Sequence, residues 1–145
     1  MDLTLALLVI AALLAATVVA GLVLRLRRPR ARAVRSDEVV DPARLGADGL
    51  GEHATLLQFS TEMCSRCPGV HRVLSSIAEE RKGVRHLDVD LTHRPDIARH
   101  FHVLQTPTTL LLDRRGQVRT RFGGAPGRDV IELELTRILE ESSHG

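Results

Sequence analysis

The sequence predicts an α/β domain, with a mixed central sheet that carries helices on both faces, preceded by one transmembrane helix. Two observations lead to this prediction. The chain begins with an uncharged apolar run, and from Thr55 onward its apolar residues switch repeatedly between the period of a strand and that of a helix. The predicted order is strand, helix, strand, helix, strand, strand, helix, so a β-α-β unit joins a β-β-α unit. We expect a transmembrane anchor at residues 1–24, a basic juxtamembrane segment and linker at 25–51, and the α/β domain at 52–145.

The amino-terminal run extends from Leu3 to Leu24 without a charged residue and consists mostly of Leu, Ala and Val. As a helix it would be roughly 33 Å long, which is enough to cross the hydrocarbon core of a bilayer. A buried helix of a soluble domain rarely continues so far without a polar face. We therefore interpret the run as a single membrane span.

A cluster of arginines follows the span, whereas Asp2 is the only charged side chain before it. Basic residues beside a span stay on the cytoplasmic side, so we expect a single-pass protein of the bacterial cytoplasmic membrane whose domain faces the cytoplasm. Anionic lipid explains these arginines and the net charge of +2, and no nucleic-acid partner is expected. The cluster comprises Arg25, Arg27, Arg28, Arg30, Arg32 and Arg35.

A cleaved secretory signal is the alternative interpretation of the apolar run, because Val18-Val19-Ala20 resembles a cleavage site. A signal peptide normally begins with a positively charged region, which is absent here, and export would carry the arginine cluster across the membrane. An exported domain would use the same functional residues with the opposite topology.

The first half of the domain predicts a β-α-β unit. The apolar run Leu56, Leu57 and Phe59 is typical of a buried strand, and residues 84–90 alternate as a second strand. Residues 36–54, before this unit, mix charge, Gly and Pro and are interpreted as a linker with a short strand and a short helix. Between the two strands, apolar residues recur at helical spacing, at Val70, Val73, Leu74 and Ile77.

The second half predicts a helix, a hairpin and a final helix. Pro95 opens a polar segment with Ile97, Ala98 and Phe101 on one side, which favours a helix. Residues 109–112 and 117–122 are predicted strands, joined by a turn at Arg114-Arg115-Gly116. The last helix is amphipathic, with apolar positions at Ile131, Leu135, Ile138 and Leu139.

The two cysteines of the chain, Cys64 and Cys67, form a Cys-x-x-Cys pattern that follows the first predicted strand and opens the next helix. Thr106-Pro107-Thr108 lies just before the third strand, Gly116 lies in the hairpin, and Gly123-Gly124-Ala125 precedes the last helix. In this order, these features resemble thioredoxin over residues 52–141. The almost exclusive use of Arg in place of Lys is typical of a high-GC genome, such as that of an actinobacterium.

The resemblance implies a thiol–disulfide oxidoreductase that acts on protein disulfides and needs no cofactor. Cys64 matches the family's exposed nucleophilic cysteine, and Cys67 matches its resolving cysteine. Pro107 matches the cis-proline opposite the cysteines, and with Thr106 and Gly124 it is expected to shape the groove for the substrate chain.

Thiol–disulfide exchange requires a thiolate that attacks a disulfide sulfur. The amino terminus of a helix stabilises a thiolate, and the cation of Arg66 is expected to add to this effect at Cys64. Two intervening residues let the sulfurs meet, so the pair can resolve a mixed disulfide within the molecule. Ser65-Arg66 stand between the cysteines in place of the family's Gly-Pro, and Arg66 is expected to shift the redox potential toward oxidising values because it stabilises the thiolate.

The sequence departs from the thioredoxin pattern in further ways. Met63 replaces the aromatic residue before the first cysteine, Gln58 replaces the buried Asp, and His86 lies near the position of the Lys that partners it. Because Gln cannot accept a proton, Glu62, His86 or a bridging water are the candidates for that role. Pro68 removes an N–H group, which favours a helix that begins later than the motif suggests.

Three other interpretations of the cysteines remain open. A structural disulfide would close too small a loop to constrain the unfolded chain strongly. A non-catalytic membrane adaptor would be consistent with the missing Asp and aromatic residue. A metal site would need a second clustered pair of ligands from another element, which the sequence lacks, so no metal is expected. Its candidate ligands are Cys64, Cys67 and His71, with a fourth from His86, His93, His100 or His102.

The favoured function is a membrane-tethered protein-disulfide reductase, since a reducing cytoplasm keeps the pair as a dithiol. Tethering raises the effective concentration of the domain toward other membrane-held proteins. We therefore expect a protein disulfide substrate or a membrane-bound redox partner, such as an electron-relay protein or a membrane-bound peroxidase. The main alternative is an exported thiol reductase for cytochrome maturation or cell-envelope disulfides.

Overall fold

The structure is a computed structural model that describes residues 2–26, 32–33 and 38–144. Helix α1 (Leu3–Leu26) contains the apolar window Leu3–Leu24, which has a hydropathy of 2.9 and no buried residue. Among the described residues, this is the one helix long and apolar enough to cross a membrane, and a signal sequence would meet the same description. The side chains of the arginine cluster, on which the predicted orientation depends, lie outside the described residues.

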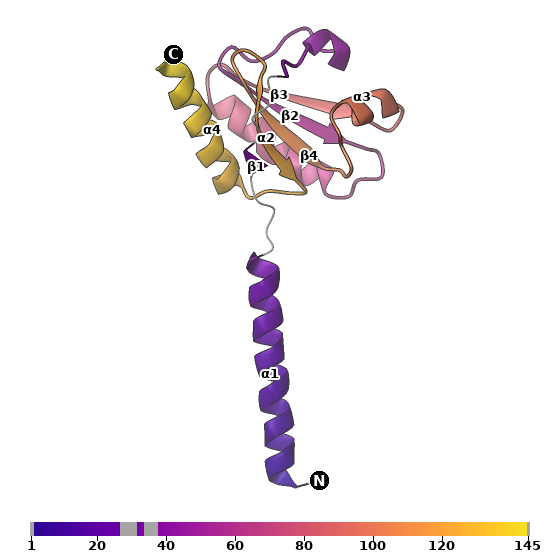
Figure 1. The fold of residues 1–145 in the computed structure, drawn as a ribbon, viewed down its shortest axis with the longest axis vertical. Helices are drawn as coiled ribbons and strands as arrows, with labels where there is room; N and C mark the ends of the chain where they lie inside the picture. Colours follow the sequence, from indigo (N-terminus) through magenta and orange to yellow (C-terminus); the bar gives the residue numbers. More distant parts are fainter. Residues whose placement is uncertain (1, 27–31, 34–37, 145) are drawn as a thin grey trace.

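The α/β domain is built on a five-stranded sheet with the strand order β1-β5-β4-β2-β3 (Figure 1). Strands β2 and β3 are parallel, and the other neighbours are antiparallel. The predicted mixed sheet and element order are therefore confirmed. The strands are β1 (Arg32–Ala33), β2 (Ala54–Ser60), β3 (Val84–Asp90), β4 (Thr108–Asp113) and β5 (Val118–Gly123).

Strands β2 and β4 lie at the centre of the sheet because their side chains are apolar on both faces. All six residues of β4 and the first six of β2 are buried. Helices α2 (Cys67–Glu80) and α4 (Arg128–Ser143) cover one face, where they pack on Leu56 and Leu111. Helix α3 (Pro95–His100) covers the other face, where it packs on Leu57 and Leu110 (Figure 1).

Helix α2 begins at Cys67, because Pro68 occupies the first turn, where its missing N–H costs nothing. Its buried residues, Val70, Leu74 and Ile77, recur at helical spacing and face the sheet. The expectation that the helix begins later than the motif suggests is confirmed: Cys64 lies in the turn before it.

The packed core also contains residues that the sequence analysis assigned to the linker. Val40 is 2% exposed and Leu45, at the end of the 3-10 helix η1 (Pro42–Leu45), is 8% exposed. Val40 donates its N–H to Gly116 O in the β4–β5 hairpin at 2.9 Å. Gly116 has a φ of 78°, and a Cβ there would lie 2.8 Å from Leu50 Cδ1. The chain thus joins the core well before residue 52.

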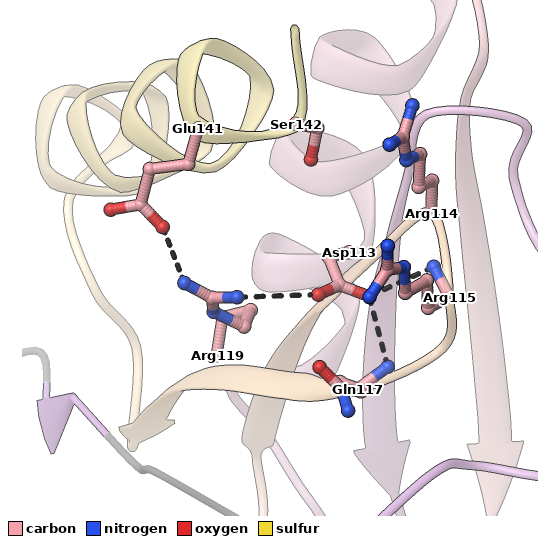
Figure 2. Close-up of a pocket in the computed structure, with 7 residues that line it drawn as sticks. All are labelled: Asp113, Arg114, Arg115, Gln117, Arg119, Glu141 and Ser142. Carbon is pink, nitrogen blue, oxygen red and sulfur yellow. Dashed lines mark hydrogen bonds and ion pairs between the residues drawn. The ribbon is translucent and has the colours of Figure 1, made fainter. Parts of the chain in front are cut away.

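A cluster of charged side chains surrounds the β4–β5 hairpin (Figure 2). Asp113 accepts hydrogen bonds from the N–H groups of Arg115 and Gln117 at 2.8 and 3.1 Å. Arg119 pairs with Asp113 and with Glu141 of α4, which ties the hairpin to that helix (Figure 2). Asp113 lies beside the first residue of β2, whereas the cysteines follow the last, so this cluster lies at the opposite end of the sheet.

Candidate dithiol active site

The two cysteines follow the carboxyl end of β2 and form a disulfide with a Cα–Cα distance of 5.4 Å. Cys64 lies in a turn, where its N–H donates to Thr61 O at 3.1 Å. Cys67 is the first residue of α2 and is 5% exposed, whereas Cys64 is half-buried. The pair therefore has one accessible sulfur-bearing residue and one protected residue.

Arg66 occupies the N-cap position of α2 and is exposed. Its side chain makes no capping hydrogen bond. The guanidinium has no ion-pair partner within the described part of the chain. Arg66 lines the groove together with Cys64, and α2 begins at Cys67, so both the cation and the helix amino terminus would favour negative charge on sulfur after reduction.

Gln58 connects Cys67 to His86 beneath the disulfide. Its side chain is fully buried, and Nε2 donates to the backbone oxygen of Cys67 at 3.1 Å. Its Oε1 lies 3.1 Å from His86 Nε2, and His86 Nδ1 lies 2.9 Å from Ser75 Oγ. Since the amide oxygen can only accept, His86 Nε2 must donate, and Nδ1 then accepts from Ser75. The chain of hydrogen bonds is complete with a neutral imidazole.

Electrostatics also favour the neutral form of His86. Burial, followed by the proximity of the His71 imidazole, lowers the pKa of His86 from 6.5 to about 4, although the charge of Asp88 opposes this shift. The His71 and His86 rings meet edge to face at 4.8 Å. His71 Nδ1 lies 2.8 Å from Asp88 Oδ2, and Asp88 Oδ1 accepts from Ser60 at 2.6 Å. At neutral pH no charged imidazole contacts Gln58.

Glu62 lies in the exposed turn before Cys64. Its N–H donates to Thr92 Oγ1 at 3.0 Å, which ties this turn to the loop after β3. Its carboxylate makes no hydrogen bond or ion pair with any residue that the structure describes. The structure thus separates the two protein groups considered as proton acceptors: His86 lies behind Gln58, and Glu62 is solvent-exposed.

Thr109 is a buried polar residue next to Gln58 that sequence analysis did not single out. It lies opposite Gln58 in the β2–β4 pairing and is fully buried. Its hydroxyl has no hydrogen-bond partner among the described residues. Every residue of β4 is buried, so the burial pattern of the strand does not distinguish Thr109 from its neighbours.

An open groove of about 490 Å³ borders the disulfide. The Thr106–Pro107 peptide bond is cis, and Pro107 O accepts from the N–H of Gly124 at 2.8 Å. The predicted groove residues Thr106, Pro107 and Gly124 therefore lie together beside Cys64. The full lining is Thr61, Met63, Cys64, Ser65, Arg66, Gln105, Thr106, Pro107 and Gly124.

Sequence analysis missed Thr61 and Gln105 as groove residues. Thr61 lies three residues before Cys64, and Gln105 directly precedes Thr106, so their positions next to motif residues could have identified them. Among the described residues, no group of three or more His, Cys, Asp or Glu side chains could hold a metal ion. The candidate ligands are otherwise engaged: the cysteines bond to each other, and His71 contacts Asp88.

A disulfide at the end of a central strand, with one accessible and one protected cysteine beside an open groove, is the arrangement of a dithiol–disulfide exchange protein. The family model described as Thioredoxin matches residues 49–137. The chain belongs to the thioredoxin family and is a thiol–disulfide oxidoreductase.

Relatives and solved structures agree with this assignment. The chain is 38% identical over 87 residues to a thioredoxin of Mycobacterium tuberculosis (strain ATCC 25618 / H37Rv), covering 58% of this chain and 72% of that protein. It is 35% identical over 106 residues to a bifunctional thioredoxin reductase/thioredoxin of Mycobacterium leprae, covering 70% of this chain and 22% of that protein. A mutant thioredoxin from Halobacterium salinarum shares the fold, with a TM-score of 0.56, 18% identity and coverage of 61% of this chain and 76% of that chain.

Proposed function

We propose that this protein is a membrane-tethered protein-disulfide reductase in which Cys64 is the nucleophile and Cys67 the resolving thiol. The observation that carries this proposal is the unequal exposure of two bonded cysteines beside an open groove. An incoming disulfide can reach Cys64, whereas Cys67 at the start of α2 is protected from a second partner.

In the proposed reaction, the Cys64 thiolate attacks one sulfur of the partner disulfide. A bond forms between Cys64 and that sulfur, and the other partner sulfur leaves as a thiolate that takes up a proton. Cys67 then loses its proton and attacks Cys64, which releases the second partner thiol and leaves the disulfide seen in the structure. The partner gains two electrons, so an external dithiol must reduce the pair for another cycle.

The surrounding residues have separate proposed roles. Arg66 stabilises the thiolate of Cys64. The Thr106, Pro107 and Gly124 backbone borders the groove and receives the substrate chain. His86 contributes by holding Gln58 against the Cys67 carbonyl, and a bridging water or Glu62 then accepts the Cys67 proton. Both ring nitrogens of His86 are already hydrogen-bonded, which supports a positioning role for His86 in place of a role as proton acceptor.

A trapping experiment tests the cysteine roles. Cys67→Ser should accumulate a mixed disulfide between Cys64 and a partner such as insulin, because the resolving thiol is absent. Cys64→Ser should form no such adduct and should not reduce insulin. If wild-type protein does not accelerate insulin reduction beyond the rate with dithiothreitol alone, the non-catalytic adaptor becomes the better interpretation. Thiol alkylation and mass spectrometry provide the readout, because the chain has no Trp or Tyr for fluorescence.

We also propose that α1 anchors the chain in the bacterial cytoplasmic membrane with the domain in the cytoplasm. The uncharged window Leu3–Leu24 and the arginines after it support this arrangement. Residues 1–24 are then the anchor, 25–51 the basic segment and linker, and 52–145 the domain, with Val40 and Leu45 of the second segment packed into the domain core.

Reporter fusions at the carboxyl terminus test the topology. A cytoplasmic domain should give an active fluorescent protein and an inactive alkaline phosphatase, and the reverse result would favour the exported reductase. A tethered function further implies a membrane-bound redox partner. A chain that starts at Ser36 should then still reduce insulin in vitro but no longer reduce its membrane-bound partner in cells. If the truncated and full chains reduced that partner equally well in cells, the tether would not be needed.

A further inference from the structure

The two most exposed apolar side chains described in the α/β domain lie on loops that border the groove: Met63 lines it, and Leu104 directly precedes the lining residue Gln105. Met63 is 94% exposed and Leu104 is 96% exposed. The two other exposed large apolar residues described outside α1 are Val39 and Leu133, at 58% and 69%. Single exposed apolar residues are common on protein surfaces, but two almost fully exposed residues on the loops beside a reactive cysteine are a candidate contact surface.

The loops that carry Met63 and Leu104 are fixed relative to each other. Met63 directly precedes Cys64, and Leu104 lies three residues before Pro107. The Thr61 and Thr106 hydroxyls, one from each loop, form a hydrogen bond of 3.2 Å. The loops that carry the two apolar side chains are therefore joined at the groove, which lowers the entropic cost of binding a partner there.

The described lining of the groove carries a positive charge. Arg66 is the one lining side chain with a fixed charge, whereas the exposed Glu62, between the lining residues Thr61 and Met63, is not part of the described lining. Arg66 also lacks an ion-pair partner within the described part of the chain. An acidic side chain beside a partner's cysteine would therefore find an available cation, and a basic one would meet like charge.

We propose that Leu104, Met63 and Arg66 select partner proteins whose reactive cystine lies in a segment with apolar and acidic side chains. This inference rests on the proposed function and names the substrate class of the same site. Leu104 and Met63 would cover apolar side chains of the segment, and Arg66 would pair with its carboxylate. A segment with polar and basic neighbours would gain neither contact.

Three disulfides test this selection with the full chain in detergent micelles and dithiothreitol as reductant. The first is a disulfide-linked dimer of the peptide Gly-Leu-Cys-Glu-Leu-Gly, with blocked termini. The second is the matched dimer of Gly-Ser-Cys-Lys-Ser-Gly. The third, bis(2-hydroxyethyl) disulfide, is small and uncharged, so it reports the reactivity of the cysteines without the docking surface. The direct reaction of dithiothreitol with each disulfide, measured without protein, is subtracted. The measured quantity is then kcat/KM for each peptide divided by that for the small disulfide.

Wild-type protein should prefer the apolar, acidic peptide by about tenfold or more. Leu104→Ser and Met63→Ser should each lower this preference by about twofold. Arg66→Ser should lower it by about threefold and reduce its dependence on NaCl, because an exposed charge pair is screened by salt. Leu104→Ser should leave the rate with the small disulfide unchanged.

Matched controls separate docking from general effects. Leu133→Ser removes an exposed apolar residue of α4, and Arg72→Ser removes an exposed cation of α2; neither residue lines the groove. Both variants should keep the wild-type preference. Equal rates for the two peptides, or a Leu104→Ser effect no larger than that of Leu133→Ser, would overturn the inference and leave the reductase function intact. A wild-type protein inert toward all three disulfides would instead refute the proposed function.

Discussion

The hydroxyl groups of Thr61 and Thr106 lie 3.2 Å apart, and their hydrogen bond joins the turn before Cys64 to the loop before Pro107. These loops come from different strand ends and are 45 residues apart in the chain. The bond is part-buried, and both threonines line the groove beside the disulfide. It therefore fixes the position of the nucleophile relative to the surface on which a partner would lie.

Thr106→Val should weaken this connection while keeping the side-chain shape. We expect the free energy of unfolding to fall by about 1 kcal/mol, as for a typical hydrogen bond, and the rate of insulin reduction to fall with it. Thr61→Val should have a similar effect. The double variant should lose less than the sum of the two, and additive losses in urea unfolding would show that the two hydroxyls act independently.

Gln58→Leu should destabilise the fold strongly. The change removes the side-chain donor to the Cys67 carbonyl and leaves the donor nitrogen of the half-buried His86 without its partner. We expect a loss of about 2–3 kcal/mol in the free energy of unfolding. Urea unfolding followed by far-ultraviolet circular dichroism provides the measurement. A loss below about 0.5 kcal/mol would mean that water replaces the amide at little cost.

His86 should make the stability depend on pH. Its pKa falls from 6.5 to about 4 on folding, so between these values the unfolded chain binds more protons than the folded one. The stabilisation is complete above pH 6.5 and is lost as the pH falls toward 4. Because the ring is partly exposed, we expect a loss of about 1–2 kcal/mol from this group.

The matched variant His86→Gln isolates the contribution of the imidazole from that of the carboxylates. Its unfolding midpoint in urea should change less than that of the wild type between pH 7 and pH 4.5. Parallel pH curves for the two proteins would contradict the depressed pKa of His86.

Thr109→Val should be neutral or stabilising, by up to about 1 kcal/mol. The hydroxyl is buried and has no partner among the described residues, so its replacement by a methyl group of similar size removes a desolvation cost. Thermal unfolding measures this effect. A loss of more than about 1 kcal/mol, with slower release of the mixed disulfide, would instead indicate that the hydroxyl holds a water beside Gln58.

A chain that starts at residue 52 should be much less stable than one that starts at Ser36. The shorter chain lacks Val40 and Leu45, which are buried in the core beside Leu57 and Val118. Loss of a buried aliphatic side chain costs about 2–5 kcal/mol, which approaches the whole stability of a small domain. Circular dichroism should show cooperative thermal unfolding for the longer chain alone. Equal midpoints would mean that this segment is dispensable.

Much of the fold could be predicted from local patterns. The strand at residues 84–90, the helix after Pro95 and the hairpin around Gly116 were identified from periodicity and turn residues, and the structure confirms each of them. The structure of residues 39–50 was harder to predict from such local patterns. Charge, Gly and Pro predicted a linker with a short strand and a short helix there, and η1 is such a helix, but the prediction missed that Val40 and Leu45 join the segment to the core.

The sequence by itself determined the order of helices and strands, the apolar run at the amino terminus, and the presence of a dithiol motif with Thr106-Pro107 after it. These features depend on neighbours along the chain, which set backbone preference and the period of burial. The tertiary structure alone decided that Gln58 reaches both the Cys67 carbonyl and His86, and that Thr61 meets Thr106. Such contacts join residues that are far apart in sequence, and they depend on strand register and helix packing, which no local pattern specifies.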